Sequence, residues 1–199
     1  MSTSPSYFDA MFDASDDPWR FKSRWYEARK RALTLACLPA QRYARAFEPG
    51  CAIGELSAAL AERCDHLLAT DGSSRALALA RQRLADSPQV ELRQAWLPQD
   101  WPTGHFNLIV ISELGYFLDS DALDTLAAHA RAALEPGGTV LACHWRRPIE
   151  GCSLDGDAVH RLLAERLGLP TLVQVQDDDL RLDVWSDDPR SIAQREGFV

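Results

Sequence analysis

The stretch Phe106-Asn-Leu-Ile-Val-Ile-Ser112 decides the fold, because it is a nearly continuous apolar run rich in β-branched residues. Such a run is typical of a strand buried on both faces of a parallel sheet. Outward from it, further strands are predicted at residues 43–47, 66–70, 89–93 and 139–143, and helices at 55–64, 74–85, 123–134 and 155–167. Strands and helices that alternate at this spacing form βαβ units, which predict a parallel sheet with helices on both faces.

The two ends of the chain complete this prediction. Residues 25–37 carry apolar residues at helical spacing and are followed by Pro39, which predicts a helix before the first strand. Residues 171–176 and 180–185 flank Asp177-Asp178-Asp179, a spacing that favours an antiparallel hairpin with an acidic turn. We therefore predict an α/β fold with one doubly wound, mostly parallel, seven-stranded sheet and an antiparallel hairpin at one edge.

Composition restricts the kinds of partner. The 199 residues are 46% hydrophobic and 25% charged, which is ordinary for a globular domain. The net charge of −8 disfavours nucleic acid, whose binding proteins neutralise many phosphates. The five cysteines form no CxxC pair and no cluster with metal-ligand spacing, which indicates reduced thiols, a cytoplasmic location and no metal site. We expect no secretion signal and no membrane span.

Two features follow predicted strands, where ligands bind in open α/β sheets. The turn Glu48-Pro-Gly50-Cys-Ala-Ile-Gly54 leads into a helix, and Asp71 closes the next strand. The turn is not GxGxxG, because Ala52 and Glu55 replace two of the glycines, and a nicotinamide dinucleotide is therefore disfavoured. A glycine turn and a ribose-binding acid without a phosphate cradle fit S-adenosylmethionine. The alternatives are a plain strand-to-helix turn and a helix-capping aspartate.

These segments also resemble a known family. The successive motifs of class I S-adenosylmethionine-dependent methyltransferases, which have a Rossmann-like fold, are similar to Phe47-Glu-Pro-Gly-Cys-Ala-Ile-Gly54, Asp71, Phe106-Asn-Leu-Ile-Val-Ile-Ser-Glu113 and Leu134-Glu-Pro-Gly-Gly138. A narrower resemblance, to the nodulation protein S family, rests on Asp16-Asp-Pro-Trp-Arg20, Tyr26-Glu27 and Ser112-Glu-Leu-Gly-Tyr-Phe-Leu118. That family N-methylates the deacetylated glucosamine end of a chitin-type oligosaccharide.

The resemblance implies how the chain would bind S-adenosylmethionine and its product S-adenosylhomocysteine. Gly50 and Gly54 would let the backbone approach the methionine portion, and Asp71 would hold the ribose. Ala95, Trp96 and Leu97 would flank the adenine, with stacking on Trp96 in place of the acidic residue found in many members. The further predicted cofactor contacts are Trp19, Tyr26, Arg31 (or Arg29, as the partner of the cofactor carboxylate), Glu48, Gly72, Ser73 and Ser112.

The N-terminal part has a separate predicted role. Residues 1–38 would form a lid and a helix, and residues 39–199 the S-adenosylmethionine-binding methyltransferase domain, within one structural domain overall. Segment 7–26 carries seven aromatic residues, which a lid over the cofactor would use to exclude water. The alternative is that these rings cover the edge of the sheet as part of the core.

For the methyl acceptor, we expect the loops after the fourth and fifth strands to supply the chemistry. Glu113 is the first candidate for the base, followed by His144 and Tyr116. Each has an alternative: a solvated loop position for Glu113, a structural histidine for His144 and core packing for Tyr116. We expect the other histidines, including His160, to be surface or structural.

Three functions remain open from the sequence. The first is N-methylation of an amino sugar or oligosaccharide amine by a monomer or homodimer. The second is methylation of another small metabolite at oxygen, nitrogen or carbon. The third is a module that binds S-adenosylmethionine without catalysis.

Overall fold

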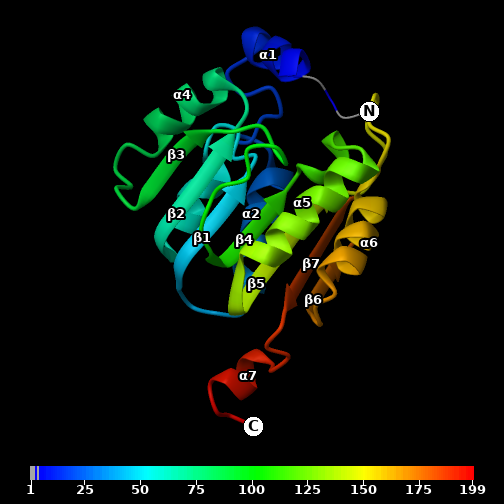
Figure 1. Cartoon of the computed structure of the whole chain (residues 1–199). Helices are drawn as coiled ribbons and strands as arrows, with labels where there is room; N and C mark the ends of the chain where they lie inside the picture. Colours follow the sequence, from blue (N-terminus) through cyan, green and yellow to red (C-terminus); the bar gives the residue numbers. More distant parts are fainter. Residues whose placement is uncertain (1–2, 4) are drawn as a thin grey trace.

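The computed structural model describes residue 3 and residues 5–199. A seven-stranded sheet with the strand order β3-β2-β1-β4-β5-β7-β6 runs through the molecule (Figure 1). The strands are β1 (Tyr43–Pro49), β2 (Cys64–Asp71), β3 (Val90–Gln94), β4 (Phe106–Ser112), β5 (Leu134–Trp145), β6 (Thr171–Gln176) and β7 (Leu180–Ser186). Strands β1 to β5 pair in parallel, and β7 pairs antiparallel with both β5 and β6. This confirms the predicted fold class.

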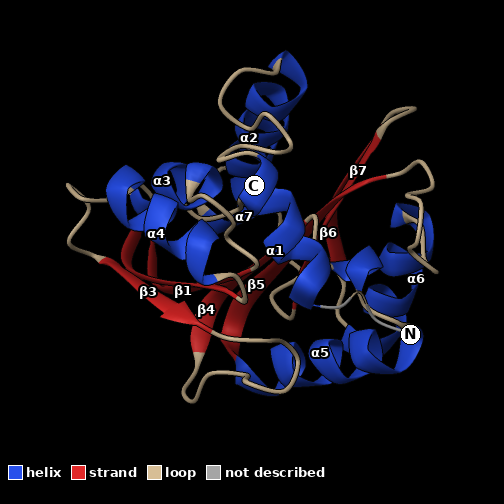
Figure 2. Cartoon of the chain, turned by 90° about the horizontal axis from the view of Figure 1, so that it is seen from above, coloured by secondary structure: helices blue, strands red, loops and turns tan. Residues whose placement is uncertain are grey.

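Helices cover both faces of the sheet, as Figure 2 shows from above. On one face lie α2 (Trp25–Cys37), α3 (Glu55–Ala61) and α4 (Ser74–Arg83), and on the other lie α5 (Ser120–Ala133) and α6 (Gly156–Leu167). Strand β4 has the predicted bounds and is buried on both faces. Leu108 and Val110 join the core beneath α2, whereas Ile109 and Ile111 join the core beneath α5 and α6. The uniform apolar run therefore reflects two cores on opposite faces of the strand.

Some predicted boundaries were wrong by several residues. Strand β1 includes Glu48 and Pro49, which pair with β2 where we predicted a turn. Strand β5 begins at Leu134 because Leu134 pairs with Phe106, so the segment predicted to end a helix is already extended. The predicted acidic hairpin turn is confirmed, since Asp177 Oδ1 accepts hydrogen bonds from the backbone N–H groups of Asp179 and Leu180.

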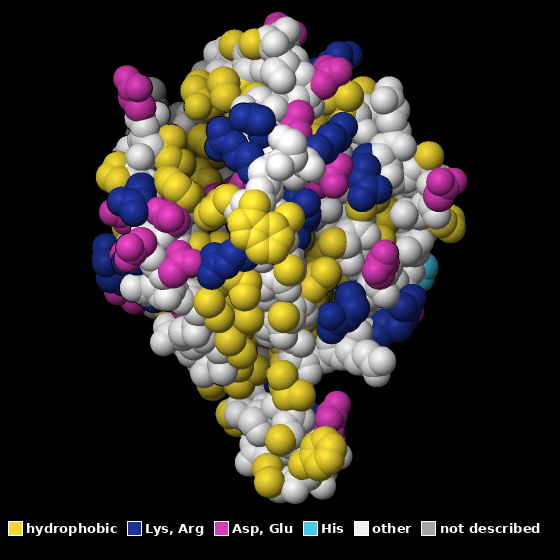
Figure 3. Space-filling view, turned by 180° about the vertical axis from the view of Figure 1, so that it is seen from behind, with side chains coloured by type: hydrophobic (Ala, Val, Ile, Leu, Met, Phe, Trp, Pro, Cys, Tyr) yellow, Lys and Arg dark blue, Asp and Glu magenta, His cyan; other side chains and the backbone are white. Residues whose placement is uncertain are grey.

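Two α-helices among the described residues were not predicted, nor was a short 3-10 helix at Gly115–Phe117. Helix α1 (Pro5–Ala14) lies across the end of the sheet at which the parallel strands finish, and it contacts α4 (Figure 1). The short helix α7 (Ile192–Arg195) lies at the opposite end. In the view from behind, the C-terminal segment projects from the body of the molecule and carries apolar side chains (Figure 3). Within the described residues, no helix is long and apolar enough to cross a membrane.

Candidate active site

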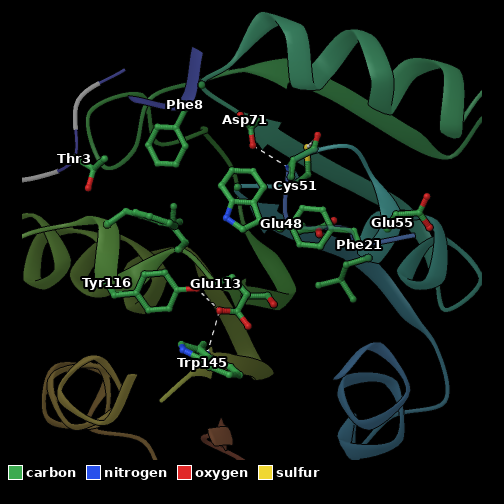
Figure 4. Close-up of a pocket in the computed structure, with 18 of the residues that line it drawn as sticks. Thr3, Phe8, Phe21, Glu48, Cys51, Glu55, Asp71, Glu113, Tyr116 and Trp145 are labelled. Atoms are coloured by element: carbon green, nitrogen blue, oxygen red, sulfur yellow. Dashed lines mark hydrogen bonds between the residues drawn. The ribbon is translucent and has the colours of Figure 1, made fainter. Parts of the chain in front are cut away.

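A cavity of about 800 Å³ lies at the carboxyl ends of the parallel strands, beneath α1. Its volume lies within the range of roughly 300–1,000 Å³ that is typical of ligand sites. The predicted residues that line it are Trp19, Tyr26, Arg31, Glu48, Gly50, Asp71, Gly72, Ala95, Trp96, Leu97, Ser112, Glu113 and Tyr116. Figure 4 shows Asp71 and Cys51 on one side of this cavity and Glu113, Tyr116 and Trp145 on the other.

Asp71 shapes the turn between β1 and α3. Its Oδ2 accepts a hydrogen bond from Ala52 N at 2.8 Å, and its Oδ1 accepts one from Ser73 N at 2.9 Å. Gly50 and Ala52 have positive φ angles of 74° and 48°, so the turn brings its backbone close to the cavity. An ionised carboxylate has about four acceptor positions, and the backbone N–H groups of Ala52, Ser73 and Gly72 all interact with Asp71, so a position is still open for a hydroxyl group of a ligand.

Glu48 lies in the floor of the cavity and is fully buried. Burial raises the pKa of its carboxyl to about 7. Its Oε2 has no hydrogen-bond partner among the described residues.

Trp96 forms the wall beside Asp71. A Cβ atom at Gly72 would lie 2.5 Å from the indole ring, so only glycine allows the ring to pack against this backbone. The ring of Phe8 in α1 lies 6.1 Å from that of Trp96. Trp96 and Gly72, each predicted as a cofactor contact, therefore lie together in one wall, with an aromatic residue from the N-terminal segment beside them.

The N-terminal segment is packed against the Asp71 side of the cavity. Phe12 is buried, its ring lies 5.6 Å from that of Trp19, and both contact Ile53 and Ala76. Arg31 lines the cavity and donates a hydrogen bond to the carbonyl of Phe21. The alternative candidate Arg29 is instead paired with Asp177 and does not line the cavity.

A buried ion cluster that was not predicted lies on the side of the cavity formed by Glu113, Tyr116 and Trp145, which we call the acceptor side. Lys30 Nζ lies 2.8 Å from Glu27 Oε2 and 2.8 Å from Glu113 Oε1. Burial alone would lower the pKa of Lys30, but the charges of Glu113 and Glu27 outweigh burial and raise it. The sequence offers one signal for Lys30, the helical spacing of Glu27, Lys30, Thr34 and Cys37 along one face of α2, but this spacing does not indicate Glu113 as the partner.

Glu113 is held by two further donors. The hydroxyl of Tyr116 and the backbone N of Trp145 both donate hydrogen bonds to its Oε2 (Figure 4). Glu113 itself has a positive φ of 55°, which is uncommon for a residue with a side chain. Tyr26 packs edge-on against the ring of Trp145, and its buried hydroxyl finds no partner in the part of the chain that is described. The predicted base and Tyr116 therefore meet in one wall of the cavity.

Three predicted site residues do not line the cavity: Gly54, Ser73 and His144. Gly54 is the N-cap of α3 with φ 82°, and a Cβ there would lie 3.3 Å from Ala80 Cα, so this glycine allows α3 and α4 to pack closely. Ser73 caps α4, since its Oγ accepts a hydrogen bond from Ala76 N.

His144 requires a larger correction. It is fully buried behind the cavity wall, where it accepts a hydrogen bond from Gly115 N and contacts His160. The prediction that it faces the cleft is wrong, because its ring points to the opposite side of β5.

The chain is similar to known methyltransferases in both sequence and fold. The methyltransferase domain family matches residues 46–138. Nodulation protein S of Sinorhizobium fredii is 32% identical over 63% of this chain and 59% of its own length, and that of Rhizobium tropici is 32% identical over 63% and 53%. The chain thus spans a little over half the length of these curated relatives.

Two solved structures match more of the chain. A Pseudomonas syringae protein assigned as a methyltransferase is 56% identical, with a TM-score of 0.74 over 82% of this chain and 99% of that one. The chain therefore belongs to the S-adenosylmethionine-dependent methyltransferases. Within them it is similar to the N-methyltransferase NodS of Bradyrhizobium japonicum, whose complex with S-adenosylhomocysteine has 25% identity and a TM-score of 0.80 over 92% and 97%.

Proposed function

We propose that the protein transfers the methyl group of S-adenosylmethionine to a primary amine of a small molecule, with an amino-sugar oligosaccharide as the preferred acceptor. The observation that carries this proposal is the arrangement of one cavity. Asp71, which can accept a hydrogen bond from a ribose hydroxyl, lies on one side. The carboxylate of Glu113, which accepts hydrogen bonds from three donors, lies on the other. The similarity to an N-methyltransferase supports nitrogen as the acceptor atom.

The Asp71 side of the cavity fits the cofactor. The carboxylate of Asp71 has acceptor capacity left for a ribose hydroxyl, and Trp96 offers an indole face to adenine. The unpartnered Oε2 of Glu48 suits a polar group of the methionine portion. Arg31 has five N–H donors, of which one meets Phe21, so it can also reach a carboxylate. When bound, S-adenosylmethionine supplies a methyl group activated by a sulfonium.

The acceptor side must orient a neutral amine and remove its proton. An amine is largely protonated near neutral pH, and Glu113 can accept the proton that leaves the nitrogen. Lys30 holds Oε1 of Glu113, while Tyr116 and Trp145 hold Oε2, so the carboxylate has a fixed direction. Such orientation can supply on the order of 7–11 kcal/mol in favourable intramolecular systems. Lys30 keeps its own proton, because its pKa is raised.

The test is methyl transfer from methyl-labelled S-adenosylmethionine to matched acceptors. One acceptor is a glucosamine oligosaccharide with a free amine, and the control is the same oligosaccharide fully N-acetylated. We expect label only in the free amine. Label in both would place the acceptor at a hydroxyl. Binding of S-adenosylhomocysteine without transfer to either would overturn the amino-sugar acceptor and leave another small metabolite or a non-catalytic module.

A further inference from the structure

A series of buried hydrogen bonds, which we call the hydrogen-bond chain, lies behind the cavity wall that contains Glu113 and Tyr116. We call this wall the acceptor wall. Gly115 N donates to His144 Nε2 at 3.0 Å, and His144 Nδ1 lies 3.1 Å from His160 Nε2. His160 Nδ1 lies 2.6 Å from Asp183 Oδ2. The four residues come from the short 3-10 helix η1 (Gly115–Phe117), β5, α6 and β7, so the chain connects four elements.

The donors and acceptors of this chain have only one consistent assignment. Because Gly115 N donates to His144 Nε2, that nitrogen carries no proton, and the proton of the neutral ring must be on Nδ1. His144 Nδ1 then donates to His160 Nε2, which leaves the proton of His160 on Nδ1, where it is donated to Asp183. Burial lowers the pKa of both histidines, in agreement with two neutral rings.

Asp183 anchors the far end of the chain in the edge hairpin. It is buried, and it also accepts hydrogen bonds from Arg181 Nε at 2.9 Å and from Gln174 Nε2 at 3.1 Å. Burial alone would raise the pKa of Asp183, but the hydrogen bond from His160 and the charge of Arg181 lower it. The hydrogen-bond chain therefore ends on a carboxylate that Arg181 and Gln174 hold in place.

The near end of the chain holds a tightly packed backbone. A Cβ at Gly115 would lie 2.4 Å from Val159 Cγ1 and 3.1 Å from His144 Nε2. Gly115 stands between Glu113, whose φ is positive, and Tyr116, whose hydroxyl reaches back to Glu113. A strained backbone of this kind persists only where its surroundings restrain it.

We propose that His144, oriented by His160 and Asp183, is a positioning residue that fixes Gly115 and thereby holds Tyr116 and Glu113 in the acceptor wall. The catalytic consequence rests on the proposed function, whereas the positioning itself does not. His144 touches neither the cavity nor a reacting atom, so it acts only through the backbone of Gly115.

The experiment compares His144→Leu with His144→Gln, whose side-chain oxygen can accept the hydrogen bond from Gly115 N. The control is His66→Gln, because His66 is exposed on β2. Amide hydrogen exchange in the free protein should be about tenfold or more faster at Gly115 and Tyr116 in His144→Leu, since a buried N–H loses its partner. Core amides such as Val140 should be unchanged, and His144→Gln should recover most of the protection.

A nitrogen-15 spectrum of the parent imidazoles tests the chain without any variant. It should show a proton on Nδ1 and none on Nε2 in both His144 and His160 at neutral pH. An Nε2–H tautomer of His144 would overturn the proposal. So would equally faster exchange throughout the core in His144→Leu, because that result indicates a general loss of stability.

Methyl transfer to the glucosamine oligosaccharide adds the catalytic readout. In His144→Leu we expect kcat to fall about tenfold while the affinity for S-adenosylhomocysteine stays within twofold of the parent, because orientation of the acceptor wall is lost and the Asp71 side is intact. An unchanged kcat with faster exchange at Gly115 would overturn the catalytic consequence. If the parent itself transfers no methyl group, the proposed function fails, while exchange and tautomer still decide the positioning role.

Discussion

Replacement of Lys30 by methionine tests the buried ion cluster most severely. Lys30 is the cation between Glu27 and Glu113, and the three side chains are only 6%, 9% and 17% exposed. Lys30→Met retains most of the side-chain volume but leaves two carboxylates close together without a counter-charge. Removal of one member of a buried ion pair costs about 3–5 kcal/mol.

For a chain of this size, 1 kcal/mol shifts Tm by roughly 2–4 °C, so the expected loss is on the order of 6–20 °C. The assay is thermal unfolding followed by circular dichroism at pH 7. The chain has one other lysine, Lys22, whose side chain is exposed, and Lys22→Met is the matched control with an expected change of about 1 °C or less. Adding Glu27→Gln to Lys30→Met should recover part of the loss, since it removes the repulsion.

A Tm for Lys30→Met equal to that of Lys22→Met would contradict this prediction. Such a result would mean that the carboxylates are solvated or protonated in the native protein. The fixed direction of Glu113, and with it the assignment of Glu113 as an oriented base, would then lose its support.

Four further predictions concern the cofactor, the lid, the base and pH. Asp71→Ala should weaken S-adenosylhomocysteine binding tenfold or more in a calorimetric titration, because one charged-acceptor hydrogen bond is worth roughly 1.5–3 kcal/mol; unchanged affinity would contradict the placement of the ribose. Segment 7–26 should exchange amide hydrogens more slowly with S-adenosylhomocysteine bound, and equal protection in both states would identify it as core. Glu113→Gln should bind the cofactor normally but lose most methyl transfer; transfer at the parent rate would exclude Glu113 as the base. Because the pKa values of His144 and His160 are lowered in the native protein, the unfolded chain binds more protons below pH 6.5. The free energy of unfolding should therefore fall as pH falls, by up to about 1.4 kcal/mol per pH unit for each histidine. In denaturant titrations, the free energy of unfolding of His144→Gln should depend less steeply on pH, and an equal dependence would contradict this prediction.

The sequence predicts those features that depend on local patterns. Strand β4 was predicted with the bounds that the structure shows. A strand buried on both faces is a continuous apolar run, whereas a helix of this length needs apolar residues on one face only. Asp71 and Gly50 were predicted because the carboxyl ends of parallel strands meet at one edge, which the order of elements already determines.

Features that depend on distant partners could not be predicted. Lys30 lies 83 residues from Glu113, and nothing in the spacing of α2 indicates that a lysine on its buried stripe meets that carboxylate. Gly50 and Gly54 are alike in sequence, but only the fold determines that one faces the cavity and the other faces α4. His144 was predicted at the correct strand end, but its ring meets His160 on the other side of the wall.

We infer that this cavity holds S-adenosylmethionine on Asp71, with the acceptor side of Glu113 opposite. A crystal structure of the protein with S-adenosylhomocysteine tests this placement. We expect density with the ribose on Asp71, the adenine against Trp96 and the sulfur facing the side of Glu113 and Tyr116. Density for the ligand elsewhere, or with its sulfur turned away from Glu113, would contradict it.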